Sequence, residues 1–370
     1  MNKPGIPDSA NRLVARTQAT DTVVLSGEGE PLTPQSIVDR LGVLLSEGNL
    51  QPDSYSLGGT VEALEERVAR DLGKEAAIWM PTGTLVNHLA LRRHCGTNTR
   101  VVLQEQSHIY HDVGDTLARL SGLNVIPLAT DRPYFTADEL QTALDQSVEG
   151  RVLNPVGVVS VESPVRRQAG QVVPWDEMQA ISRLCREQGI PVHLDGARLY
   201  MMSAETGIGI REYADLFDSV YVSMYKYFGS PFGAVLAGNS EFISGMFHDR
   251  RMFGGGLSSS YLIAGLALDG IDGFEVRYKE AFDKAISLFA DINDLSGIEV
   301  RRFEQGSNIF ELVIDSAIDT GRFVGKLLDL GIVIHWPNDN WPIPLLHVNT
   351  TVLRCPNAEI TQAFSTAASS

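Results

Sequence analysis

An acid and an arginine follow directly on a short apolar segment of this chain. The segment IPVHL, residues 190–194, leads into Asp195, and Arg198 comes three residues after the acid. A run this short and apolar is typical of a buried strand. Because parallel sheets bind ligands at the carboxyl ends of their strands, the pattern predicts that Asp195 and Arg198 belong to a binding site.

One lysine lies just beyond a second apolar segment. Lys226 follows DSVYVSM, residues 218–224, and is the sole cation of residues 218–238. Burial among apolar and aromatic neighbours disfavours the ammonium form, and the neutral amine can attack a carbonyl carbon. Ser223, three residues earlier, adds a hydroxyl group. This segment predicts Schiff-base chemistry at Lys226.

A glycine-containing turn farther upstream predicts an anion site. In WMPTGTLVNHLAL, residues 79–91, a strand-like run enters a turn that contains Gly83 and Thr84 and continues as a helix. Backbone amides at the start of a helix bind phosphate well. A carboxylate beside a pyridinium nitrogen, a Schiff-base lysine and such a turn are together what pyridoxal phosphate requires.

The elements that must position these residues alternate along the chain. Helical periodicity places Ile37, Leu41, Leu44 and Leu45 on one face of residues 34–48, and Val61, Leu64, Val68 and Leu72 on one face of residues 60–73. Short apolar runs occupy residues 75–80, 100–104, 124–128, 156–162, 190–195, 218–224 and 233–238. Strands of this kind, separated by helices, predict an α/β fold with a mostly parallel seven-stranded sheet.

The pattern changes after about residue 257. A long helical stretch, residues 260–294, precedes mixed helical and strand-like pieces. We therefore expect an N-terminal arm and helix over residues 1–50, a large domain over 51–270 and a smaller α+β domain over 271–370.

Composition narrows the class of protein. The chain has 370 residues, 44% of them hydrophobic, and its net charge of -16 argues against nucleic acid or an anionic membrane as the main partner. The three cysteines are too few and scattered for a disulfide framework, and no run reaches the ~18 apolar residues that cross a bilayer. A cytoplasmic enzyme is expected. His108, His111 and Asp112 have the spacing of metal ligands, but no second ligand cluster accompanies them, and no metal is expected.

Several strings resemble one family. They are LEERVARDLGKEAAIWMPTGTLVN, SHIYHDVGDTLARLSG, AISRLCREQGIPVHLDGARLY, SMYK and GGGL, with HLDGARL at residues 193–199 the most specific of them. From about residue 55 to about residue 270, the chain resembles the threonine aldolase and aromatic amino acid β-eliminating lyase family. The members of this family are fold-type I enzymes dependent on pyridoxal phosphate.

The resemblance implies roles for eight residues. Lys226 would bind the cofactor as a Schiff base, Asp195 would keep the pyridine nitrogen protonated, and His108 would stack on the ring as a catalytic residue. Gly83, Thr84 and Ser223 would contact the cofactor, Arg198 would lie near the ring oxygen and the substrate carboxylate, and Arg354 would bind that carboxylate. The implied reaction cleaves a β-hydroxy-α-amino acid to glycine and an aldehyde through a quinonoid intermediate, in a homo-oligomeric enzyme, a dimer or a tetramer.

The chain departs from the family pattern at three places. Ser163, Pro164 and Val165 stand where members usually carry Asn-Thr-His, so the second histidine of the family is missing. Other reactions on the same cofactor therefore remain open, namely β-elimination, transaldol exchange and racemisation. A cofactor-binding protein without turnover is a further alternative. No basic residue follows the triple glycine, so Arg250 or Arg251 would contact the phosphate of a neighbouring subunit. The aromatic residues around Lys226 either shape a pocket or pack in the core; they are Tyr225, Tyr227 and Phe228.

Overall fold

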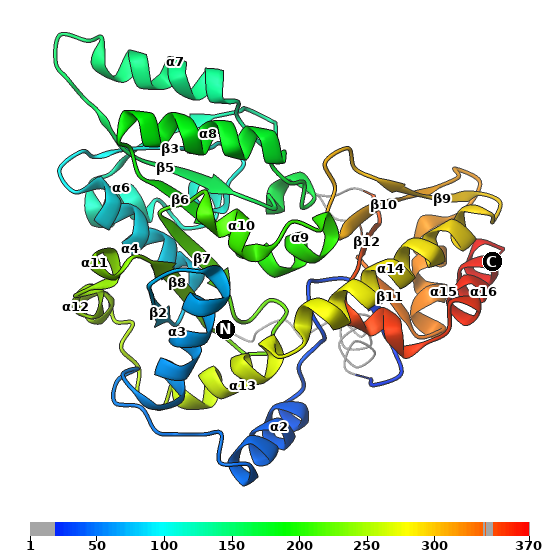
Figure 1. The fold of residues 1–370 in the computed structure, drawn as a ribbon. Helices are drawn as coiled ribbons and strands as arrows, with labels where there is room; N and C mark the ends of the chain where they lie inside the picture. The colour runs from blue at the N-terminus through cyan, green and yellow to red at the C-terminus, as the bar shows by residue number, and fades with distance from the viewer. Residues whose placement is uncertain (1–18, 336, 338–342, 370) are drawn as a thin grey trace, which may run out of the picture. The chain divides into compact units, whose positions relative to one another are not determined.

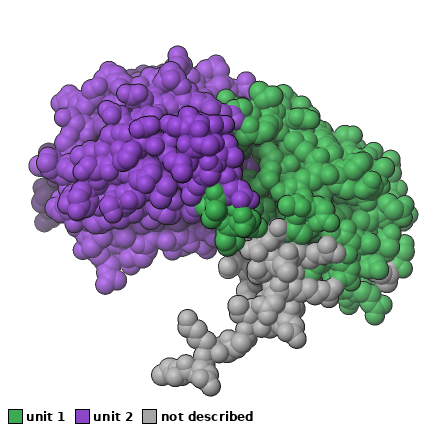
Figure 2. Space-filling view, turned by 90° about the horizontal axis from the view of Figure 1, so that it is seen from below, with its two compact units in different colours: residues 1–38, 273–370 green, residues 39–272 purple. Residues whose placement is uncertain are grey.

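The computed structural model describes residues 19–335, 337 and 343–369. The chain forms two compact units (Figure 2). The large unit is Asp39–Asp272, and the smaller unit combines residues before Asp39 with those from Gly273 onward. The smaller unit draws on both ends of the chain because strand β1 (Val23–Leu25) pairs in parallel with β11 (Ile332–Ile334). The domain boundaries expected after residues 50 and 270 stay a prediction.

The large unit contains the seven-stranded sheet that the sequence predicts. Its strands lie in the order β2-β8-β7-β6-β5-β3-β4. Their bounds are β2 Ala76–Met80, β3 Arg100–Gln104, β4 Asn124–Leu128, β5 Val156–Glu162, β6 Val192–Asp195, β7 Ser219–Ser223 and β8 Ala234–Gly238. Strand β8 is antiparallel to both of its neighbours, and all other pairs are parallel. The α/β prediction with a mostly parallel sheet is confirmed.

The large unit also contains helices, several of which pack against this sheet (Figure 1). They are α3 Gly59–Leu72, α4 Gly83–Cys95, α5 His108–His111, α6 Thr116–Ser121, α7 Ala137–Val148, α8 Trp175–Gln188, α9 Leu199–Thr206, α10 Ile210–Asp215, α11 Ser240–Ile243, α12 Met246–Met252 and α13 Tyr261–Ile271. Helix α4 contacts six of the seven strands, from β2 to β3, so it is the element that links their ends. Every residue of β5, β7 and β8 is buried, as continuous apolar runs predict.

Two predicted helices differ in how they are covered. In α3, the predicted face of Val61, Leu64, Val68 and Leu72 is completely buried, and the helix ends at Gly73 in the left-handed conformation. In α2 (Pro34–Ser46), only Leu44 is buried, while Val43 and Leu45 are 55% and 69% exposed. Most apolar side chains of α2 are therefore not buried against the rest of this chain.

The smaller unit is α+β, as expected. Its three-stranded antiparallel sheet has the order β12-β10-β9. The remaining elements are β9 Ile298–Arg302, β10 Ile309–Ile314, β12 Leu345–His347, α14 Phe274–Asn293, α15 Thr320–Asp329, α16 Asn357–Ala368 and the 3₁₀ turn η2 Thr350–Arg354. The long helical stretch predicted over 260–294 is broken into α13 and α14, because Gly273 adopts a φ of 66°. Among the described residues, no helix is both long and apolar enough to cross a membrane.

Gly270 in α13 generates a stability prediction. A Cβ atom at this position would lie 1.7 Å from the carbonyl oxygen of Phe228, so the Gly270→Ala substitution must push the helix away from the backbone. We expect a loss of roughly 3 kcal/mol, measured by urea unfolding. Gly42→Ala is the control: Gly42 is exposed in α2 with no atom near its Cβ position, and alanine there should add about 1 kcal/mol. Equal stability of the two variants would contradict this reading.

Candidate active site

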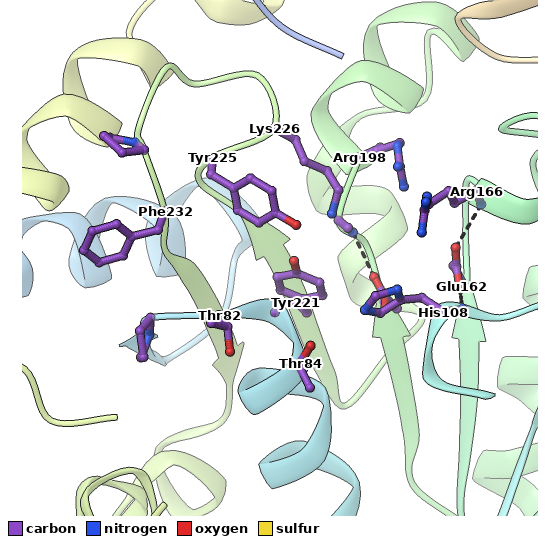
Figure 3. Close-up of a pocket in the computed structure, with 15 residues that line it drawn as sticks. Thr82, Thr84, His108, Glu162, Arg166, Arg198, Tyr221, Tyr225, Lys226 and Phe232 are labelled. Carbon is purple, nitrogen blue, oxygen red and sulfur yellow. Dashed lines mark hydrogen bonds between the residues drawn. The ribbon is translucent and has the colours of Figure 1, made fainter. Parts of the chain in front are cut away.

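A pocket of about 310 Å³ opens at one edge of the large sheet. Strands β2 and β7 run in the same direction because each is antiparallel to β8, so the ends of β2, β5, β6 and β7 meet at this edge. Figure 3 shows the 15 residues that line the pocket, all of them from the large unit. They are Pro81, Thr82, Gly83, Thr84, His108, Glu162, Arg166, Asp195, Ala197, Arg198, Tyr221, Tyr225, Lys226, Pro231 and Phe232.

The pocket brings together six of the eight predicted site residues: Gly83, Thr84, His108, Asp195, Arg198 and Lys226. Ser223 is completely buried at the end of β7 and is not among the lining residues. Arg354 belongs to the smaller unit, where it donates to the carbonyl oxygen of Thr22 at 3.0 Å and pairs with Glu30 at 2.7 Å. The sequence had no signal for either difference, because neither burial nor the pairing of a distant acid is visible in a motif.

Asp195 is held from two sides at the end of β6. Its Oδ2 accepts a hydrogen bond from the side-chain nitrogen of Asn87 at 2.7 Å, and its Oδ1 accepts one from the backbone nitrogen of Ala197 at 3.2 Å. The residue is buried, and an acid in such a place needs these partners. Its carboxyl group therefore has a fixed orientation at the pocket wall.

The anion site predicted from the sequence falls at the start of α4. Thr82 caps this helix, with its side-chain oxygen accepting from the backbone nitrogen of Leu85 at 3.2 Å. The first amides of a helix have no partners within the helix and point out of its N-terminus. A Cβ atom on Gly83 would lie 2.1 Å from the hydroxyl oxygen of Tyr221, so only glycine fits here. Gly83 therefore lets the start of α4 approach the Tyr221 side chain at the pocket wall.

Lys226 extends into the pocket between Tyr225 and Arg198 (Figure 3). Its Nζ atom lies 5.0 Å from the ring centre of Tyr225 and 5.9 Å from that of Tyr221. The aromatic neighbours of Lys226 divide between the pocket and the core. Tyr225 lines the pocket and is 46% exposed, whereas Tyr227 and Phe228 are buried and pack against each other at 4.5 Å.

His108 enters the pocket from the start of α5. Its ring nitrogen Nδ1 lies 3.4 Å from a carboxylate oxygen of Asp112, which also pairs with Arg166 at 3.1 Å and Arg167 at 3.4 Å. The acid next to His108 is thus balanced by two guanidinium groups. Asp112 orients the imidazole through Nδ1 and leaves Nε2 available to a ligand.

Glu162 is a pocket residue that the sequence reasoning missed. It ends β5 as Asp195 ends β6, so an acid at the end of an apolar strand was the available signal. Its carboxylate accepts from the backbone nitrogens of His108 at 2.5 Å and Arg166 at 2.9 Å. Burial, and next the charge of Asp195, raise the pKa of Glu162.

The loop after Glu162 carries the departure from the family pattern. Val165, which replaces the second histidine, is completely buried and is not among the residues that line the pocket. The next residue, Arg166, does line it, and its role was also missed. Tyr221 on β7 and Phe232 in the loop before β8 are further pocket residues that no sequence motif predicts.

The expected role of Arg250 at a neighbouring subunit is wrong. Its side chain is completely buried and donates to the carbonyl oxygens of Trp79 at 2.7 Å and Ser56 at 3.0 Å. Arg250 is therefore a structural residue that holds the loop before α3. Arg251 is exposed, with its guanidinium carbon 4.0 Å from the ring centre of Tyr55.

The pocket fits the pyridoxal phosphate expected from the sequence. The helix start at Gly83 and Thr84 supplies N–H donors for a phosphate, and Asp195 and Lys226 supply an acid and an amine in the same pocket. Among residues 19–335, 337 and 343–369, no group of three or more His, Cys, Asp or Glu side chains is placed to hold a metal ion.

Glu162 gives a pH prediction for the apoprotein. Because its pKa is raised in the folded state, the folded protein binds this proton more tightly than the unfolded chain does. The stability contributed by the proton is lost as the pH rises above the ordinary value of a glutamate. Glu162→Gln removes this loss, so its unfolding midpoint in urea, relative to the parent protein, should rise between pH 5 and pH 8.

Glu187→Gln is the control for this measurement, because Glu187 is exposed to solvent on α8. Its difference from the parent protein should be the same at both pH values. A Glu162→Gln variant whose relative midpoint falls with rising pH would show that the acid is stabilised as a carboxylate.

Comparisons with known proteins identify the family of this chain. A family model described as beta-eliminating lyase matches residues 45–315. The chain is 33% identical over 274 residues to the low-specificity L-threonine aldolase of Candida albicans, which covers 73% of this chain and 72% of that protein. It is also 33% identical over 214 residues to the low specificity L-threonine aldolase of Saccharomyces cerevisiae. This alignment covers 56% of this chain and 54% of that protein, so it spans about half of the relative's length.

A solved structure is similar over nearly the whole chain. It is that of a Listeria monocytogenes EGD-E protein assigned as an L-allo-threonine aldolase, with 29% identity and a TM-score of 0.80. The alignment covers 96% of this chain and 99% of that one. The resemblance inferred from the sequence is therefore confirmed, and the chain belongs to the beta-eliminating lyase family.

Proposed function

We propose that this pocket binds pyridoxal phosphate on Lys226 and cleaves a β-hydroxy-α-amino acid to glycine and an aldehyde. The observation that carries the proposal is the meeting of Lys226, Asp195 and the start of α4 in one pocket. The names of the relatives support the reaction, since two of them are low-specificity L-threonine aldolases. The proposed substrates are threonine-like or phenylserine-like amino acids.

The cofactor contacts follow from the positions of the residues. The backbone amides of Gly83 and Thr84 bind the phosphate, and the carboxylate of Asp195 faces the pyridine nitrogen. When bound, pyridoxal phosphate supplies a conjugated ring that accepts the electron pair of a bond broken at the α-carbon. Asp195 supports this by placing a fixed negative charge beside the ring nitrogen.

The substrate is positioned by cations. Arg198 lines the pocket and is the proposed contact for the α-carboxylate, with Arg354 of the smaller unit as a second. Arg354 pairs with Glu30, so a substrate carboxylate has to compete with this acid. Holding the carboxylate fixed decides which of the bonds at the α-carbon breaks.

His108 is the proposed base. It takes the proton of the β-hydroxyl group as the bond between the α- and β-carbons breaks, the aldehyde leaves, and the α-carbon takes up a proton to give glycine. Asp112 holds the imidazole through Nδ1 and stabilises the charge that the ring gains. Because Val165 replaces the second histidine of the family, His108 alone carries this task in our proposal.

We also propose a homo-oligomer, a dimer or a tetramer, in the cytoplasm. The exposed apolar side chains of α2 support association with a second copy; they are Val38, Val43 and Leu45. Arg251 and Tyr55 are the proposed contacts to a neighbouring subunit, since both are exposed and they stack on each other. The free cysteines support a reducing compartment.

Product analysis tests the reaction. With cofactor and L-threonine or phenylserine, the protein should form glycine and aldehyde in equal amounts, and His108→Phe should lower the rate by about 10²- to 10⁴-fold. His111→Phe is the matched control, because His111 is exposed on the same short helix and is not among the lining residues. A keto acid and ammonia from serine, with no glycine from any β-hydroxy amino acid, would establish β-elimination instead.

The position of the Schiff base is tested by covalent trapping. Borohydride reduction of the yellow holoprotein should fix the cofactor on the peptide that contains Lys226, as read by mass spectrometry. Lys74 is the internal control: burial lowers its pKa, but it donates to the carbonyl oxygen of Phe217 and is not among the lining residues. An adduct on Lys74, or an unchanged spectrum in Lys226→Ala, would refute the assignment.

A further inference from the structure

A file of buried polar side chains leads away from Asp195 beneath the pocket. We call these residues the relay; they are Asn87, His193, Ser219 and His94. Consecutive members are joined by hydrogen bonds of 2.8–3.0 Å, and Asn87 reaches Asp195 at 2.7 Å. None of them lines the pocket, and the proposed reaction does not use them.

The secondary structure explains why these residues meet. His193 and Asp195 lie two residues apart on β6 and so point to the same face. The register of β6 and β7 places Ser219 beside His193. Asn87 and His94 lie seven residues apart, two turns along α4, on the face that packs on these strands.

The chemistry of Asp195 fixes the direction of the first bonds. A carboxylate only accepts hydrogen bonds, so the atom of Asn87 that faces Asp195 is the amide nitrogen. The amide oxygen of Asn87 then faces His193 and accepts from Nε2. His193 must therefore carry its proton on Nε2.

The outer bonds follow from the same reasoning. Neutral His193 with a proton on Nε2 has a lone pair on Nδ1, which accepts from the hydroxyl group of Ser219. The Ser219 oxygen in turn accepts from Nε2 of His94. Every donor in the relay points toward Asp195, and such aligned bonds strengthen one another.

A proton on Oδ2 of Asp195, the oxygen that Asn87 contacts, would reverse the hydrogen bonds of the relay. Asn87 would turn its oxygen to the acid and its amide nitrogen to Nε2 of His193, whose proton must then sit on Nδ1 and point at Ser219. Mixed arrangements leave two donors or two acceptors facing each other inside the protein, which costs about 1–3 kcal/mol for each mismatched group. The relay therefore has two consistent states, one in which Oδ2 of Asp195 accepts a hydrogen bond and one in which Oδ2 carries a proton.

We propose that the relay is a positioning device that holds Asp195 in a fixed orientation with Oδ2 as an unprotonated acceptor, and that the tautomer of His193 reports whether that oxygen carries a proton. The proposal concerns residues of this chain alone. Its consequence for the cofactor rests on the proposed function, because Asp195 must then face the pyridine nitrogen.

Burial keeps both imidazoles of the relay neutral, as the tautomer argument requires. It lowers the pKa of His193 to about 3 and that of His94 to about 4. The charge of Asp218 raises the pKa of His94 and that of Arg93 lowers it, but burial dominates. Near neutral pH, the relay therefore transmits hydrogen-bond direction and carries no charge of its own.

Other titratable groups lie near Asp195. Its charge acts on Glu162 of β5 and Tyr221 of β7, and Arg198 from the turn after β6 and Lys226 from the loop after β7 line the same pocket. The acid Glu162 opposes a negative charge on Asp195, while Arg198 and Lys226 favour it. The relay adds a hydrogen bond from the neutral amide of Asn87, which stabilises the negative charge on Asp195.

The first test needs no cofactor. Nitrogen-15 NMR of histidine-labelled apoprotein at pH 7.5 should show His193 with its proton on Nε2, the signal being assigned by its loss in His193→Gln. The Ser219→Ala variant should shift the Nδ1 resonance toward that of a nitrogen without a hydrogen bond, and Ser219→Thr should restore it. A proton on Nδ1 of His193 in the parent protein would overturn the proposal.

The second test uses the holoprotein. Without the Asn87 donor, the carboxylate of Asp195 becomes more basic and draws the proton of the ring nitrogen toward itself. The ring nitrogen then carries less positive charge, so the lysine imine keeps its own proton to higher pH. The pH midpoint of the visible absorbance in Asn87→Ala should rise by roughly one unit. Asn308→Ala is the control, since Asn308 is equally buried but lies in the smaller unit, and its midpoint should not move.

The outcomes separate the two proposals. An unchanged midpoint in a folded, cofactor-loaded Asn87→Ala variant overturns the relay and leaves the aldol reaction standing. If the parent protein bound no pyridoxal phosphate, the proposed function would fail, and the tautomer of His193 in the apoprotein would still decide for or against the relay.

Discussion

The direction of the strands is the constraint on which the pocket depends. Strand β8 runs against both β2 and β7, and this single reversal keeps β2 parallel to the strands that end in Glu162, Asp195 and Ser223. The turn before α4 and the loop that carries Lys226 therefore open at the same edge. If β2 ran the other way, the start of α4 would lie at the opposite edge of the sheet.

Helix α4 connects this edge to the interior. Its first turn forms the pocket floor, and its inner face carries the polar residues that contact the end of β6 and the start of β7. Polar side chains are costly in such a place unless each finds a partner, so Asn87, His193 and Ser219 constrain one another. The helix thus serves the anion site and the acid of the pocket at once.

Sequence reasoning succeeded where a local pattern has one physical meaning. The seven apolar runs of the sequence correspond to the seven strands of the large sheet. Asp195 follows the run IPVHL and lines the pocket because it stands at the carboxyl end of a parallel strand. It failed where the outcome depends on distant partners. Arginine is usually a surface residue, but Arg250 is buried and donates hydrogen bonds to the carbonyl oxygens of Ser56 and Trp79. Glu162 carries the same signal as Asp195, an acid at the end of an apolar strand, but only the order of the strands shows that both acids line one pocket.

The contact between Gly83 and Tyr221 has a consequence for how the site can vary. Any side chain at position 83 would meet the phenol ring from a strand that lies 138 residues farther along the chain. The two positions therefore form one unit of sequence variation: a natural or engineered relative can hold a larger residue at 83 only with a smaller one at 221. In an alignment of this family, the pair should covary as a small-to-large exchange, and a library that randomises position 83 alone keeps the clash with Tyr221 in every variant other than glycine.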